Sequence, residues 1–338
     1  MRLALFLQQS LLFLFLWFVS VSGVYAADQL IIYSDVDNKA LKAFTTFYGK
    51  EQQVRIHTKT DTTEALIEKL QQDGEGSQAD VFVTSNMAYL EIGRQMGLFK
   101  PPAIGSVTGG VPMKFRAKDD AWTGLAASAQ VLVIKDGKQA TELKSMFDLA
   151  DPKWKGRIAV PSMSDEGFVN MVTAYRELKG DEVVKAWLLG LKENAEGKYY
   201  GTSLERVRHV LSGKKDVAIA GHADLFSAVP NIDDVVDNIL IPDQGKQGMG
   251  VVWNVLGVAI IKANQQSHVA ENFIDLFLTA RGQGYLHDLA AYYSINKEFA
   301  ANPNMPEQSK YKIVDVPLEV YGQKREETIT FLQTIFAD

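Results

Sequence analysis

The chain has 338 residues, no cysteine and a formal net charge of −6. Its basic residues are scattered, so it lacks the concentrated positive charge of a nucleic-acid-binding protein, and we expect no nucleic-acid partner. Without cysteine, neither a disulfide nor a lipid-modified cysteine can form. With 46% hydrophobic and 22% charged residues, the composition is that of an ordinary folded protein.

The first segment has the pattern of a secretory signal peptide. Arg2 precedes an apolar run at residues 11–21, and small residues around Ala26 form a cleavage site before the polar Asp28. The alternative is a membrane anchor, but the apolar run is shorter than the roughly 20 residues that a spanning helix needs. We expect cleavage after Ala26 and a periplasmic location for the mature protein.

Alternating strand and helix patterns follow. Short apolar, β-branched runs predict strands, and each is followed by a stretch with helical spacing. The predicted strands are residues 30–33, 80–84, 131–134 and 157–160, and the predicted helices are residues 40–48, 87–96, 168–178 and 204–211. This alternation indicates an α/β fold.

The mature chain is too long for one ordinary domain. Two extended segments, residues 124–135 and 248–262, are long enough to cross between two lobes and form a hinge. We predict that lobe 1 comprises residues 27–126 plus 257–338 and that lobe 2 comprises residues 127–256. The alternative is that the two segments are long strands of a single sheet.

Ligands of open α/β sheets bind beyond the carboxyl ends of the strands, which makes the loops there candidate binding loops. The candidate ligand-binding residues in these loops and beside them are Ser34, Asp35, Asp37, Thr84, Ser85, Asn86, Ser128, Gln130, Ser164, Asp165, Glu166, Thr202, His222, Asp224, Trp253 and Asn254. For each hydroxyl, amide or carboxylate the alternative role is to cap a helix, which is typically worth about 1 kcal/mol. Thr202, with Glu205 three residues later, fits a capping box.

The run DLADPKWKGRIAV at residues 148–160 resembles the segment that leads into the second lobe of periplasmic ferric-iron-binding proteins. Similar segments follow the family's order over nearly the whole mature chain, at residues 30–33, 64–70, 79–84, 96–101, 213–220, 254–257, 270–283 and 293–296. The resemblance implies a two-lobed type II periplasmic binding protein clamshell with two crossing strands. It also implies a monomeric receptor that captures Fe(III), another metal ion or an iron chelate by lobe closure and serves an ABC permease at the inner membrane.

The chain departs from that family at the expected ligand positions. Where the family has a tyrosine pair that supplies phenolate ligands, this chain has Ala223 and Asp224. Its counterpart of the family's anion-binding loop carries the acidic residues Asp165 and Glu166, and small neutral residues replace an arginine around residues 128–130. These departures imply a ferric complex without the family's visible phenolate-to-iron band.

Acidic residues take the place of the lost groups. We expect five carboxylates in the cleft, those of Asp35, Asp37, Asp165, Glu166 and Asp224, and expect their mutual repulsion to raise some of their pKa values. Hard cations prefer oxygen ligands, so Asp35 and Asp224, with His222 as a nitrogen donor, are the candidate metal ligands.

Other assignments remain open. An organic amine held by aromatic residues such as Trp253, or an organic oxyanion, is the alternative ligand. The alternative for His222 is a hydrogen-bonded structural histidine, and for Asp35 and Asp37 it is helix capping.

Catalysis is not expected. The chain has no cysteine nucleophile, no G-x-S-x-G elbow, no H-E-x-x-H motif and no P-loop. We therefore expect no enzyme and no catalytic cofactor. A sensor protein that docks on a membrane kinase remains the alternative to a transport receptor, because both use the same clamshell.

Overall fold

The computed structural model describes residues 28–103, 109–135, 137, 142–229, 236–295, 299 and 311–337. The predicted signal peptide and its cleavage site lie outside these residues. Within the described ranges, no helix is both long and apolar enough to cross a membrane.

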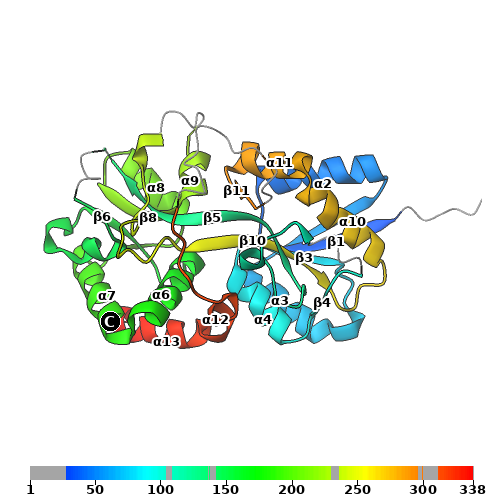
Figure 1. The fold of residues 1–338 in the computed structure, drawn as a ribbon, viewed down its shortest axis with the longest axis horizontal. Helices are drawn as coiled ribbons and strands as arrows, with labels where there is room; N and C mark the ends of the chain where they lie inside the picture. Colours follow the sequence, from blue (N-terminus) through cyan, green and yellow to red (C-terminus); the bar gives the residue numbers. More distant parts are fainter. Residues whose placement is uncertain are drawn as a thin grey trace, which may run out of the picture.

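Lobe 1 confirms the predicted strand–helix alternation, and its first strand and first helix are longer than the sequence indicates. Strands β1 (Gln29–Ser34), β2 (Arg55–Thr60) and β3 (Val81–Thr84) are parallel, with β1 between the other two. The other elements on this side, the right of Figure 1, are α2 (Lys39–Gln52), α3 (Thr63–Asp73), α4 (Met87–Gln95), β4 (Phe99–Lys100), α10 (Ser267–Leu278) and α11 (Ala280–Ala290).

Lobe 2 repeats the α/β arrangement on the left of Figure 1. Its strand β6 (Ile158–Pro161) lies between β7 (Tyr199–Tyr200) and β8 (Val217–Gly221) and is parallel to both. The helices around this sheet are α6 (Glu166–Lys179), α7 (Asp181–Ala195), α8 (Ser203–Leu211) and α9 (His222–Ser227).

Two long antiparallel strands, β5 (Thr123–Ile134) and β10 (Trp253–Ile261), run between the lobes (Figure 1). In lobe 1, β10 pairs with β3 while β5 pairs with β11 (Tyr293–Ser294). In lobe 2, β5 pairs with β8 and with β9 (Ile239–Leu240). The two segments therefore cross between the lobes and are also long strands of one continuous sheet, while their role as a hinge stays a prediction.

The predicted lobe boundaries lie inside the crossing strands. The register of β10 against β5 shifts between Leu256 and Gly257. A Cβ atom on Gly257 would come within 2.5 Å of the end of the Leu90 side chain on α4 and 3.1 Å from the Thr123 carbonyl oxygen, so β10 passes close to α4 and β5 at this glycine.

An aromatic cluster fixes α2 against α10 and α11. The Phe44 ring stacks on Phe277 with centroids 3.7 Å apart and meets the edge of Phe273 at 5.4 Å. The buried Tyr48 hydroxyl donates a hydrogen bond of 2.9 Å to the carbonyl of Val269. Tyr285 of α11 joins this cluster, with its ring centroid 5.9 Å from that of Phe44.

The carboxyl-terminal helices correct the predicted lobe assignment. Helix α12 (Leu318–Gln323) packs mainly on α4 of lobe 1, but α13 (Arg325–Phe336) packs on α6 and α7 of lobe 2 (Figure 1). The prediction that all of residues 257–338 belong to lobe 1 is therefore wrong for α13. The apolar face of that helix, which includes Leu332 and Phe336, is buried against lobe 2, and Phe336 meets the ring of Phe168.

Candidate functional site

A cavity of about 760 Å³ opens between the two lobes, and we call it the interlobe cavity. The wall from lobe 1 consists of the start of α2, Ser85, and the end of α11 together with the turn that follows it. The wall from lobe 2 consists of α9. Figure 1 shows α9 facing α11 and α2 across the gap. Of the predicted binding residues, Asp37, Ser85 and Asp224 line this cavity.

Carboxylates outnumber ammonium groups on the wall of the interlobe cavity. Asp37, Asp224 and Asp288 line it, against the single ammonium group of Lys39 and the side chain of His287. Asp37 pairs with Lys42 at 2.5 Å, but both side chains are more than half exposed, so solvent screens this pair. The cavity therefore favours a ligand with positive charge.

Of the predicted site residues, Asp224 has the position that best suits contact with a ligand in the interlobe cavity. It lies in the first turn of α9, directly beyond the carboxyl end of β8, and accepts a hydrogen bond from the Ser203 side chain. Burial raises the pKa of Asp224 above its ordinary value, and the Asp165 carboxylate adds to this increase, whereas Arg206 opposes it. A cation in the cavity would relieve the cost of burying this charge.

Tyr292 also lines the cavity, from the turn between α11 and β11. Burial raises the pKa of its phenol, and the negative charges of Asp224 and Asp35 raise it further. No other described residue forms a hydrogen bond with its hydroxyl. Tyr292 is not among the predicted binding residues, because the residues around it carry no motif that distinguishes it from a packed tyrosine.

Asp35 is engaged within lobe 1. Its carboxylate accepts hydrogen bonds from the Thr63 hydroxyl at 3.0 Å, the Ser85 hydroxyl at 3.1 Å and the Ser85 backbone N–H at 3.2 Å. Burial raises the pKa of Asp35, and these hydrogen bonds oppose the increase. The carboxylate thus fixes the loop that carries Ser85, and burial, rather than the predicted repulsion between carboxylates, raises its pKa.

His222 is a hydrogen-bonded structural histidine. Its Nδ1 accepts a hydrogen bond of 2.9 Å from the Ala129 backbone N–H, and its Nε2 lies 2.9 Å from the Ala291 carbonyl and donates to it. Burial lowers the pKa of His222 to about 4. Since both nitrogens are occupied, the predicted metal-ligand role of His222 is wrong for this conformation.

The His222 environment predicts a loss of stability in acid. Because the folded state holds this histidine neutral down to about pH 4, its contribution is present above pH 6.5 and is lost between pH 6.5 and 4, as the unfolded chain takes up a proton. We expect this pH-dependent part of the free energy of unfolding to be about 3 kcal/mol. Urea unfolding across this pH range measures it, and the free energy of unfolding of His222→Gln should lack this part of the pH dependence. Parallel pH profiles in the two proteins would contradict the prediction.

Two predicted cleft carboxylates are used in ion pairs. Asp165 caps α6 through the Phe168 backbone N–H and pairs with the buried Arg206 at 2.8 Å. Glu166 pairs with Arg325 at 2.5 Å. Each carboxylate thus has a guanidinium partner that the sequence did not reveal, and neither lines the interlobe cavity. Of the two, only Asp165 contributes to the raised pKa of Asp224.

Most other predicted binding residues make local hydrogen bonds. Ser34 and Thr84 each accept one from a backbone N–H two residues on, and Thr202 caps α8. The Asn86 side chain accepts a hydrogen bond from the Ala88 N–H, and the Asn254 side chain accepts one from the Met87 N–H. The Ser128 hydroxyl forms a hydrogen bond with His222, and the Ser164 hydroxyl forms one with Ser162. Gln130 is buried against Gly167. Of these residues, Asn86 and Thr202 are the ones that cap helices, at the starts of α4 and α8.

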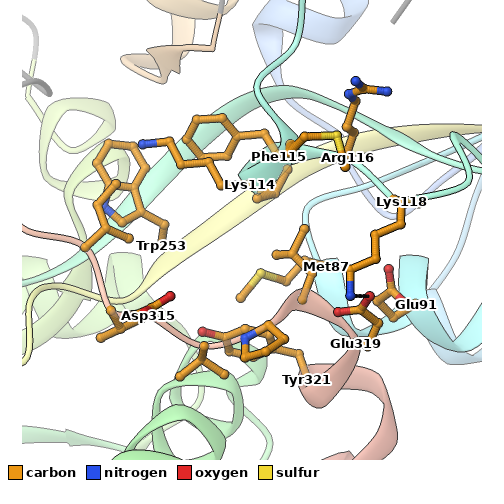
Figure 2. Close-up of a pocket in the computed structure, with 18 residues that line it drawn as sticks. Met87, Glu91, Lys114, Phe115, Arg116, Lys118, Trp253, Asp315, Glu319 and Tyr321 are labelled. Carbon is orange, nitrogen blue, oxygen red and sulfur yellow. Dashed lines mark ion pairs between the residues drawn. The ribbon is translucent and has the colours of Figure 1, made fainter.

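Trp253 lies at a second cavity of about 560 Å³, which we call the hinge cavity (Figure 2). This cavity lies between β10, α4 and the segment that leads into α12, and Phe115 and Met87 form part of its apolar wall. A Lys118–Glu319 ion pair of 2.8 Å lies at its edge, as Figure 2 shows. Trp253 does not line the interlobe cavity, which corrects its predicted place beside the other candidates.

Metal donors are not assembled in this conformation. Within the described ranges, no three His, Cys, Asp or Glu residues form a group that could hold a metal ion. Tyr199 and Tyr200 form the edge strand β7, where Tyr199 packs on Phe336 at 5.3 Å and Tyr200 packs on His209 at 4.6 Å. Position 223 is an alanine on the cavity wall, and α9 carries no tyrosine.

Comparison with known proteins identifies the family. A family model described as bacterial extracellular solute-binding protein matches residues 30–288, so the chain belongs to that family. It is 28% identical over 284 residues to the Fe(3+)-binding periplasmic protein of Serratia marcescens, which covers 83% of each chain. It is 25% identical over 293 residues to iron uptake protein A1 of Synechocystis sp., which covers 85% of this chain and 80% of the relative.

A solved structure shows the same fold. The ferric binding protein from Campylobacter jejuni superposes with a TM-score of 0.82 at 21% identity, covering 90% of this chain and 99% of that one. Together with the two relatives, it confirms the predicted resemblance and the two-lobed type II periplasmic binding protein fold.

Proposed function

We propose that this chain is the periplasmic receptor of an ABC importer and that its cargo is iron(III), free or chelated, or another metal ion. The observation that carries the proposal is the interlobe cavity, an acidic space lined by both lobes of a solute-binding fold. The names of the relatives support iron as the cargo. The receptor acts as a monomer, releases its cargo to an inner-membrane permease and catalyses no reaction.

The cavity favours a chelate over a bare ion. Asp35 and His222 are occupied by hydrogen bonds within the protein, which leaves few donors near Asp224. Its volume of about 760 Å³ lies within the range of small-molecule sites, about 300 to 1,000 Å³. A metal ion that brings some of its own ligands would fill this space and still meet the Asp224 carboxylate.

Native mass spectrometry of protein purified without chelator tests the cargo. We expect a bound mass that contains iron, together with a small organic ligand, and metal analysis of the same sample identifies the ion. A bound organic amine without metal would replace this proposal by the organic-cation alternative, which the aromatic residues Phe226 and Tyr292 on the cavity wall would suit. A bound oxyanion would contradict both.

Lobe closure predicts a change of overall size. Cargo contacts from both lobes exist together only when the lobes are close, so binding should favour the closed form. We expect the radius of gyration of the mature protein to decrease when ferric citrate is added. Small-angle scattering measures this, with bovine albumin as a control for effects of the additive. Identical scattering curves at saturating ferric citrate would contradict closure.

A further inference from the structure

A polar network joins the two lobes at the start of α6, outside the interlobe cavity lining. Glu166, in the first turn of α6, accepts hydrogen bonds from Arg325 Nη2 at 2.5 Å and from Arg325 Nε at 3.1 Å. Arg325 is the first residue of α13, which packs on lobe 2. This bidentate, charge-assisted pair is a geometrically specific contact.

The same carboxylate reaches lobe 1. Glu166 Oε2 accepts a hydrogen bond of 2.8 Å from the Asn86 amide nitrogen, and Asn86 Oδ1 lies 3.2 Å from the Asn170 amide nitrogen. Asn86 is the N-cap of α4, so its side chain is held by lobe 1 through the Ala88 backbone N–H. One carboxylate therefore connects α4 of lobe 1 with α6 and α13 of lobe 2.

Arg325 itself touches both lobes. Its guanidinium lies 4.5 Å from the centroid of the Tyr89 ring on α4, while two of its hydrogen bonds go to Glu166 on α6 and a third goes to Glu326 on its own helix. The Arg325 side chain is only 8% exposed, so solvent screens this pair much less than the surface pairs of the molecule. A buried guanidinium held from both sides resists separation of α4 and α6.

We propose that Arg325 is a positioning residue for lobe closure, which fixes Glu166 against Asn86 and Tyr89 and so sets the spacing of the lobes in the empty protein. The role concerns the clamshell itself and not the identity of the cargo. Its test uses the protein without cargo, so its failure is distinguishable from failure of the proposed iron function.

Interlobe distance measurements test the proposal directly. Because the chain has no cysteine, Lys50→Cys on α2 and Lys185→Cys on α7 create two exposed labelling sites, one in each lobe. Electron–electron resonance between spin labels then reports the distribution of lobe spacings. We expect Arg325→Met and Glu166→Gln each to shift this distribution to longer and broader distances than in the parent protein.

A double variant separates positioning from folding. Arg325→Met alone leaves the Glu166 carboxylate without its guanidinium and should lower the melting temperature, whereas adding Glu166→Gln removes the unpaired charge and should recover part of that loss. The lobe spacing should stay long in the double variant, because the bidentate contact is still absent. If the melting temperature and the parent lobe spacing were both recovered in the double variant, the role of Arg325 would be purely structural and the proposal would be overturned.

Arg176 offers a matched control. Its side chain is also 8% exposed and lies 4.5 Å from an aromatic ring centroid, that of Phe331, but its partners Asp181 and Glu327 are both outside lobe 1. Arg176→Met should therefore lower the melting temperature without changing the lobe spacing. An unchanged spacing in Arg325→Met, or an equal change in Arg176→Met, would overturn the proposal.

Discussion

Replacing Asp224 with asparagine is expected to weaken cargo binding at least about tenfold, more than the roughly 1 kcal/mol of a lost helix cap. Asp224 is a half-buried carboxylate on the wall of the interlobe cavity, and a cation there gains more from a charge that water screens less. Asparagine keeps the shape and one acceptor oxygen, so the substitution removes mainly charge. Isothermal titration with ferric citrate measures the change in affinity.

The same substitution should leave the empty protein as stable or slightly more stable. The pKa of Asp224 is raised in the folded state, so its contribution is fully present below the unfolded pKa and is lost as the pH rises through the folded pKa. At neutral pH the ionised carboxylate thus costs stability, and asparagine removes that cost. Melting curves with and without ferric citrate separate this effect from binding.

Asp288→Asn is the control for Asp224→Asn. Asp288 lines the same cavity but is exposed, so water screens its charge and we expect a much smaller loss of affinity. Equal losses in the two variants would mean that only the overall charge of the cavity matters. Unchanged affinity in Asp224→Asn would contradict the cationic cargo.

The fold was predictable because its signals are local. Apolar runs at residues 30–33 and 157–160 and the helical spacing after them fall within the observed elements β1, β6, α2 and α6 or closely beside them. The length of β5 and β10 also showed that two segments cross between lobes. The position of α13 was not predictable, because its apolar face would fit against either lobe.

The site was predictable only in part, because the roles of its residues depend on distant partners. Asp165 and Glu166 look like free cleft carboxylates in sequence, but Arg206 and Arg325 lie 41 and 159 residues away from them along the chain. Similarly, the nitrogens of His222 bind backbone groups 93 and 69 residues away. Residue type and loop position identify where a ligand binds, but not which polar groups are already occupied.

Replacing Tyr292 with phenylalanine is expected to remove a visible absorption band from the ferric complex and to lower iron affinity about tenfold. The family resemblance implies a ferric complex without a phenolate band, because Ala223 and Asp224 stand where it implies a tyrosine pair. The structure instead places the phenol of Tyr292 on the wall of the interlobe cavity, near the carboxylates of Asp224 and Asp35. A trivalent ion stabilises the deprotonated phenol that these carboxylates oppose.

Absorption spectra of the ferric citrate complex, recorded for the parent protein and Tyr292→Phe, test this prediction. Tyr199→Phe and Tyr200→Phe are the controls, since both rings pack at the far edge of the lobe 2 sheet and should leave the band unchanged. Phenylalanine keeps the ring and removes only the hydroxyl, which has no hydrogen-bond partner among the described residues, so the melting temperature should not fall. A colourless ferric complex of the parent protein, or a band that persists in Tyr292→Phe, would show that iron binds without this phenol. Full affinity in Tyr292→Phe with loss in Tyr292→Ala would instead indicate that the ring face binds an organic cation.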